Sequence, residues 1–128
     1  MVAVGHVPAM RFTIKRFGSY LRGDLHDRVS GEETDEFLQA VAAAALTSGH
    51  DRILLSVRTS RAVFRVEQFR LAEHMEVVAS RPGHRIALVA DDPDVRLAQQ
   101  YIATLARLRG LSVQAFESEA TAMAWLLA

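Results

Sequence analysis

Residues 52–64 read RILLSVRTSRAVF, a compact apolar run that stops at two hydroxyl residues flanked by arginines. The run from residue 52 to residue 57 lacks strict alternation of apolar and polar side chains, which is typical of a strand covered by helices. Residues 85–90, RIALVA, show the same pattern. These two segments therefore predict the central strands of a sheet.

An amphipathic helix is expected between the two strands. Residues 66–79 place apolar side chains on adjoining helical stripes and leave Arg70, Glu73 and Glu76 for water. Pro82-Gly83 then breaks the pattern. A strand, a helix and a second strand in this order call for a right-handed crossover, so the two central strands are expected to be parallel.

Three further helices are indicated by the residues at their ends. The segment 30–33, SGEE, has capping-box spacing and opens one helix. Asp92-Pro93 can cap and begin a second, which Gly110-Leu111 would end in a Schellman motif. Residues 112–116 supply a last strand, after which Ser118 can cap the terminal helix. Each strand after the first is therefore followed by a helix along the chain.

The start of the chain predicts a hairpin. Short strands are expected near residues 12–14 and 20–25, around the small-residue turn Gly18-Ser19. Residues 1–9 are interpreted as a flexible tail and residues 10–128 as a single domain. The hairpin adds one antiparallel strand to an otherwise parallel sheet.

The composition excludes several classes of function. The 128 residues include 15 Lys plus Arg, 15 Asp plus Glu and no cysteine. The balanced charge predicts no nucleic-acid partner, and the lack of cysteine excludes disulfides, thiol catalysis and cysteine-ligated metals. No segment has the features of a signal peptide or approaches the ~20 apolar residues of a membrane span, so we expect a cytoplasmic protein.

Three stretches carry a resemblance to a known family. They are LLSVRTSRAVFRVEQF (54–69), RIALVADDPDVRLAQQYIATLARLRGLSVQAF (85–116) and EATAMAWL (119–126). Together with the predicted order of elements, they resemble the STAS domain of anti-sigma-factor antagonists, the SpoIIAA-like fold, in a bacterial branch labelled STAS/SEC14-like whose members are mostly uncharacterised. The resemblance implies an α/β fold with a mixed, mostly parallel sheet, an N-terminal hairpin and about four helices.

The same resemblance implies a regulatory or protein-binding module without catalytic residues or cofactors. In phosphorylatable antagonists, the turn after the third strand carries an Asp-Ser-Ser/Thr-Gly motif whose serine a partner kinase modifies. The nearest position here is Ser60, with Thr59 beside it, while Arg58 replaces the aspartate and Arg61 follows. Ser60 is therefore a candidate phosphorylation site on an exposed turn, where replacement by alanine is expected to change stability by at most ~0.5 kcal/mol.

The arginines of this turn suggest an anion site. If Ser60 lies near the start of the following helix, Arg58, Arg61 and Arg65 could bind a phosphate, a carboxylate or an anionic head group there. The alternative interpretation is a solvated turn whose arginines pair with acidic residues nearby in the sequence, namely Asp51 or Glu67.

Phe64 leaves further alternatives open. It can pack under the following helix as core, contact a partner protein or a second copy of the chain, or form the rim of an apolar pocket. A pocket at Phe64 would fit a second function, suggested by the SEC14-like label, in which the protein carries a small apolar or anionic ligand. Its cavity would lie at the second and third helices and involve Phe64, Phe69, Leu71 or Tyr101.

Other motifs argue against an enzyme or a metal site. There is no GxSxG, GxGxxG or P-loop sequence, and the five histidines are scattered without ligand spacing. Asp92 is interpreted as a helix cap rather than a metal ligand.

The apolar end of the chain, Trp125 to Leu127, favours a homodimer unless Trp125 packs inward on the sheet.

Overall fold

The computed structural model describes residues 11–27, 31–60, 65–79 and 81–128. Within these ranges the chain forms, in order, β1 (Arg11–Arg16), β2 (Leu21–His26), α1 (Gly31–Ser48), β3 (Arg52–Arg58), α2 (Arg65–Val78), β4 (Arg85–Ala90), α3 (Pro93–Leu108), β5 (Val113–Ala115) and α4 (Glu119–Leu126). The order of elements confirms the sequence prediction, with small shifts at their ends.

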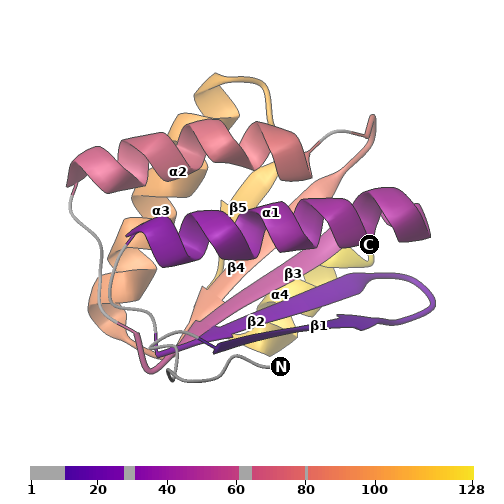
Figure 1. Ribbon diagram of the computed structural model, residues 1–128, viewed down its shortest axis with the longest axis horizontal. Coiled ribbons are helices and arrows are strands. Elements are labelled where there is room, and N and C mark those ends of the chain that lie inside the picture. Colours follow the sequence, from indigo (N-terminus) through magenta and orange to yellow (C-terminus); the bar gives the residue numbers. More distant parts are fainter. Residues whose placement is uncertain (1–10, 28–30, 61–64, 80) are drawn as a thin grey trace, which may run out of the picture.

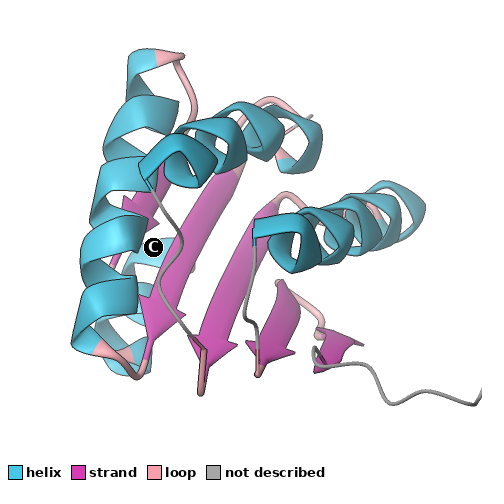
Figure 2. Ribbon diagram, turned by 60° about the vertical axis from the view of Figure 1, so that its left-hand side comes forward, coloured by secondary structure: helices cyan, strands magenta, loops and turns pink. Residues whose placement is uncertain are grey.

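The strands form one mixed sheet in the order β1-β2-β3-β4-β5. β1 and β2 pair antiparallel, whereas β2, β3, β4 and β5 pair parallel. Helices α1, α2 and α3 cover one face of the sheet, and α4 lies behind the opposite face (Figure 1). Figure 2 shows the layer of three helices packed over the twisted sheet. The predicted α/β architecture is therefore confirmed.

The main core fills the space between the sheet and α1 to α3. Alternate residues of β2, β3 and β4 point into it and meet the apolar stripes of the helices. Its fully or almost fully buried members include Leu21, Leu25, Phe37, Val41, Ile53, Leu55, Leu71, Met75, Ile86, Leu88, Val95, Ile102 and Val113. Burial of this apolar surface is the main driving force for folding.

Gly23 lets α1 approach β2 closely. A Cβ atom at Gly23 would lie 2.9 Å from Phe37 Cζ and 3.0 Å from Val41 Cγ2. Real Cβ atoms essentially never come within 3.0 Å of another side chain. The glycine therefore makes room in the strand for the Phe37 ring, which is completely buried.

A smaller apolar cluster lies on the opposite face, under α4. Its buried residues are Leu54 of β3, Ala87 and Val89 of β4, and Ala122 and Leu126 of α4. β3 and β4 are thus apolar on both faces, which explains why their sequences lack alternation. The central strands inferred from residues 52–57 and 85–90 are confirmed.

Both predicted ends of α3 are present, whereas Ser30, the predicted cap of α1, lies outside the described residues. Asp92 Oδ2 accepts hydrogen bonds from the backbone N–H groups of Asp94 at 2.9 Å and Val95 at 3.0 Å. At the other end of α3, the Gly110 and Leu111 N–H groups bond the carbonyls of residues 107 and 106, as a Schellman motif requires. None of the helices in the described ranges is long and apolar enough to cross a membrane.

Candidate functional site

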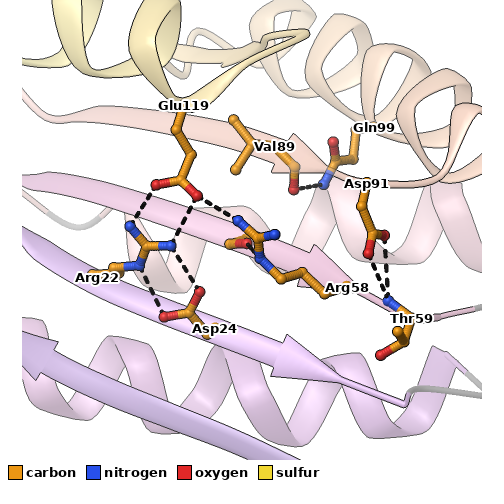
Figure 3. Close-up of polar contacts among 9 residues, drawn as sticks. Arg22, Asp24, Arg58, Thr59, Val89, Asp91, Gln99 and Glu119 are labelled. Atoms are coloured by element: carbon orange, nitrogen blue, oxygen red, sulfur yellow. Dashed lines mark hydrogen bonds and ion pairs between the residues drawn. The ribbon is translucent and has the colours of Figure 1, made fainter.

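The first residue after β3, Thr59, has a left-handed backbone conformation with a φ of 46°. This conformation is unfavourable for L-residues and especially for a β-branched one. The Thr59 N–H donates to both carboxylate oxygens of Asp91, at 3.3 Å and 3.2 Å (Figure 3). Because Asp91 directly follows β4, this contact joins the carboxyl ends of two neighbouring strands.

Asp27, which directly follows β2, holds Thr59 from the other side. Thr59 Oγ1 donates to Asp27 Oδ1 at 3.0 Å, and the Asp27 N–H donates to the Arg58 carbonyl at 3.2 Å. We call Asp27, Thr59 and Asp91 the Thr59 clamp. Its hydrogen bonds offset the strain at Thr59 and fix the direction in which the chain leaves β3.

Ser60 follows the clamp and is half-buried, whereas Thr59 is exposed. The Ser60 hydroxyl donates to the Arg58 carbonyl at 2.8 Å. The expectation that Ser60 is an exposed turn residue is therefore wrong, and its hydroxyl closes a local turn. Ser60 nevertheless lies at the carboxyl edge of the sheet, where open α/β sheets commonly bind their ligands.

Arg58 points toward α4, on the face of the sheet opposite to α2. Its Nε donates to Ser56 Oγ at 3.1 Å, and its Nη2 bonds Glu119 at the start of α4 (Figure 3). Asp51, one of the two partners considered from the sequence, instead lies 3.8 Å from the Nε of Arg52. The acidic partner of Arg58 is thus distant in sequence.

Glu119 also binds Arg22 of β2. Arg22 Nη1 and Nη2 donate to the two Glu119 oxygens at 2.7 Å and 3.1 Å, and Arg22 Nε and Nη2 donate to Asp24 at 2.9 Å and 3.1 Å. We call Arg22, Asp24, Arg58 and Glu119 the charge network. Two positive and two negative groups balance within it, and it fastens α4 to β2 and β3.

The network shifts the protonation equilibria of its members. The hydrogen bonds that Arg22 donates to Glu119 and then to Asp24 raise its pKa above the ordinary value. The hydrogen bonds of Arg22 with Glu119 hold the pKa of that carboxyl below its ordinary value of 4.5. Both groups are therefore charged at neutral pH, as the ion pairs require.

A groove of about 250 Å³ lies between the ends of β3 and β4 and the start of α4. Its described lining consists of Ser56, Arg58, Val89, Ala90, Asp91, Glu117, Ser118 and Glu119. Three carboxylates against one guanidinium make this lining acidic on balance. The groove is therefore unsuited to the anion that the arginines of the turn suggested.

The other predicted site residues are only partly visible. Arg61 and Phe64 lie outside the described residues, and Arg65 begins α2 with its side chain also outside them. The anion site around Arg61 and Arg65 and the packing of Phe64 therefore remain predictions.

The predicted ligand cavity has one counterpart in the described core. A cavity of about 30 Å³ lies between the sheet and α1 to α3, and Leu71 lines it. Tyr101 does not belong to its lining, and the side chain of Phe69 is outside the described residues. As described, the cavity is far smaller than the ~300–1,000 Å³ pockets that hold typical small-molecule ligands.

Metal-binding geometry is not found in the described ranges, where no group of three or more His, Asp or Glu side chains is placed to hold an ion. Asp92 caps α3 as its sequence position predicted.

At the chain end, the Trp125 ring packs on Phe116 with centroids 5.4 Å apart, and Leu126 is completely buried. These contacts support the inward-packing alternative for Trp125, while self-association remains a prediction.

Sequence reasoning found the turn but not the residues that hold it. Asp27, Asp91 and Glu119 are separated from Thr59 or Arg58 by 32 to 61 residues. One signal was available, because Arg22 and Asp24 lie two apart in a strand and must share a face. Two opposite charges on one face of a strand next to the centre of a sheet indicate that something polar covers them.

Comparison with known proteins identifies the family. No curated protein matches the chain. The solved structures that resemble it include an anti-sigma factor antagonist from Mycobacterium paratuberculosis, at 12% identity over 93% of this chain and 95% of that one, with a TM-score of 0.66. They also include an uncharacterized DUF3478-family protein with a SpoIIAA-like fold from Shewanella loihica, at 13% identity over 98% and 99% of the two chains, with a TM-score of 0.53. These likenesses concern the fold, whereas the SpoIIAA-like family model matches residues 21–127 of the sequence itself. The chain therefore belongs to the SpoIIAA-like family.

Proposed function

We propose that this protein is a non-enzymatic regulatory module that binds a partner protein at the carboxyl edge of its sheet. The observation that carries the proposal is the Thr59 clamp, in which two carboxylates hold a strained non-glycine residue just before Ser60. Strain that is maintained by surrounding contacts is concentrated at functional sites. The shared fold of the anti-sigma factor antagonist supports the same class by analogy.

The proposed contact surface is the turn after β3 with the start of α2, comprising Arg58, Thr59, Ser60, Arg61, Phe64 and Arg65. The clamp supports this choice because it presents the described part of the turn in one conformation, and a preorganised surface binds with a smaller loss of entropy. The proposed location is the cytoplasm.

We further propose that a charge change at Ser60 switches the module. A phosphate on Ser60 would add about −1.5 to −2 charge beside Thr59, which two carboxylates already hold. Repulsion would weaken the contacts of Thr59 with Asp27 and Asp91 and reshape the turn. The Arg58 guanidinium is bound to Glu119, so Arg61 and Arg65 are the proposed partners of such a phosphate.

Affinity capture from native cells tests the proposal. The baits are the wild-type protein, Ser60→Ala, Ser60→Asp and the control Ser19→Asp, which adds the same charge at an exposed serine between β1 and β2. A stoichiometric protein partner should be bound by the wild type and by Ser19→Asp and lost with Ser60→Asp. Mass spectrometry of the captured wild type should also find phosphopeptides that contain Ser60.

Two results would contradict specific parts of this proposal. A partner bound equally by Ser60→Asp and the wild type would place the contact surface elsewhere, even if Ser60 carried phosphate. The absence of any partner for the wild type would contradict the protein-binding function itself.

The second candidate is a carrier of a small apolar or anionic ligand. The cavity beneath α2 and α3 supports its location, since Leu71 was predicted to line such a site and does so. Its volume of about 30 Å³ requires the helices to separate before a ligand of ordinary size could enter. Native mass spectrometry of freshly isolated protein tests this candidate, and an unliganded mass under gentle conditions would count against it.

A further inference from the structure

The cavity at the junction of the sheet with α1, α2 and α3 contains a polar corner. Most of its described lining is apolar, but one glutamine and one threonine belong to it. The lining residues are Thr34, Phe37, Leu38, Leu55, Val57, Leu71, Met75, Leu88, Gln99 and Ile102. All of them are buried, so a polar atom among them must find its hydrogen-bond partner inside the protein or lose the bonds it makes with water when unfolded.

Gln99 is the polar residue on the core-facing stripe of α3, between Val95 and Ile102. Only 5% of its surface is exposed. Its Nε2 donates to the Val89 carbonyl at 2.9 Å, which fixes the orientation of the side-chain amide (Figure 3). Its Oε1 is buried and has no hydrogen-bond partner among the described residues. A side chain that lines the cavity therefore carries an unused acceptor.

Thr34 supplies a second polar group to the same cavity. It lies on α1 and is 6% exposed. A threonine hydroxyl has one hydrogen to donate and two lone pairs to accept, so beside one other hydrogen bond it retains the capacity for a further one. Residues with polar side chains on two helices, α1 and α3, therefore line the cavity.

The size of the cavity limits the molecule that can use these groups. A cavity must offer about 10–15 Å³ of accessible volume to hold one buried water, and the water needs two to four polar partners. The cavity offers about 30 Å³, together with Gln99 and Thr34. None of the described lining residues carries a charge. They would therefore offer a charged donor such as ammonium no opposite charge in return for its lost hydration.

We infer that this cavity is a binding site for one small neutral hydrogen-bond donor, water itself in the free protein, which donates to Gln99 Oε1 and bonds the Thr34 hydroxyl. Bound there, the water bridges α1 to α3 across the core. Since Gln99 also holds the Val89 carbonyl, the bridge lies two residues before Asp91 in the Thr59 clamp. The inference concerns the core and does not depend on the proposed partner.

Water-to-protein nuclear Overhauser effects in methyl-labelled protein test the inference. The methyl groups of Leu55, Leu88 and Ile102 line the cavity and should show effects from a long-lived water. Oxygen-17 relaxation dispersion should count one more long-lived water in the wild type than in Gln99→Met, which keeps the side-chain length without the acceptor. Gln100→Met is the matched control, because the neighbouring Gln100 is exposed, and it should retain both signals.

Two outcomes would overturn the inference. One is the absence of water contacts at these methyl groups in the wild type, and the other is their persistence in folded Gln99→Met. If Gln99→Met does not fold, wild-type protein under xenon pressure decides the question. Xenon prefers dry apolar cavities, so large xenon-induced shifts at Leu55, Leu88 and Ile102 would show a dry site, whereas unchanged shifts with water contacts would support the bound water.

Discussion

The backbone N–H of Thr59 donates to both oxygens of the Asp91 carboxylate, and so links the chain leaving β3 to the chain leaving β4. Thr59 needs this link because a β-branched residue with a φ of 46° is strained by about 1–2 kcal/mol. Glycine would adopt the same conformation without strain. The sequence instead places a hydroxyl there, which gains a second anchor at Asp27.

Replacing Asp91 with asparagine should loosen the turn without disturbing the core. Asparagine keeps one acceptor oxygen but loses the charge that strengthens the hydrogen bond from Thr59. We expect hydrogen exchange of the Thr59 amide to become about tenfold faster, equivalent to ~1.4 kcal/mol of local opening free energy. Amide exchange followed by NMR provides the measurement.

The matched control for this variant is Asp94→Asn, which removes a carboxylate from the exposed first turn of α3. It should leave the exchange of the Thr59 amide unchanged. Equal rates for Asp91→Asn and the wild type would mean that the carboxylate contributes nothing to holding Thr59.

Ser60→Ala should be more costly than a substitution on an open turn. The hydroxyl of Ser60 donates to the Arg58 carbonyl at 2.8 Å, and the side chain is half-buried. Loss of such a hydrogen bond costs about 0.5–1.5 kcal/mol. Urea unfolding of Ser60→Ala should show a decrease within this range, and that of the exposed control Ser19→Ala a change below ~0.5 kcal/mol. Indistinguishable midpoints for the two variants would argue that the Ser60 hydroxyl is solvated.

The elements were predictable because they depend on residues close together in the chain. Asp92-Pro93 and Gly110-Leu111 define the ends of α3 through local hydrogen bonds. The apolar segments 52–57 and 85–90 identify strands that are buried on both faces. Local capping and burial patterns therefore sufficed for the fold.

The site was predictable only as a location. Arg58 ends β3 at the carboxyl edge of the sheet and Thr59 and Ser60 follow it, but the partners of Arg58 and Thr59 come from distant parts of the chain. Glu119 is 61 residues away from Arg58, and both were charged residues with several possible partners. Whether Arg58 meets Glu119 depends on which face of β3 lies against α4. A one-residue change in the register of the strand would turn every side chain to the opposite face.

The charge network predicts how the free energy of unfolding depends on pH. Arg22 lowers the pKa of Glu119 below 4.5 in the folded protein, so the unfolded chain binds the proton more readily. The contribution to the free energy of unfolding is therefore fully present above about pH 4.5 and is lost as the pH falls through the folded pKa. Glu119→Gln should lower stability by about 1 kcal/mol at pH 7, since a partly exposed pair is screened by solvent.

Urea unfolding between pH 7 and pH 3 measures this effect. The difference between the wild type and Glu119→Gln should shrink as the pH falls, because protonation removes the same charge from the wild type. Glu117→Gln, from the loop before α4, is the control and should follow the wild-type profile. A difference for Glu119→Gln that stays constant with pH would show that packing, rather than charge, accounts for it.

Gly23→Ala tests the close packing of α1 on β2. The added methyl group would lie 2.9 Å from Phe37 Cζ and 3.0 Å from Val41 Cγ2, and both side chains are completely buried. Overpacking of this kind costs about 1–3 kcal/mol, because buried neighbours must leave their preferred rotamers. The midpoint of urea unfolding should fall accordingly.

Gly18→Ala is the matched control, since no atom outside its chain neighbours lies within 4 Å of the added Cβ. Its free energy of unfolding should stay within ~0.5 kcal/mol of the wild-type value. Equal stability of Gly23→Ala and Gly18→Ala would mean that α1 can move away from the sheet at little cost, and that the register of Phe37 against β2 does not depend on the glycine.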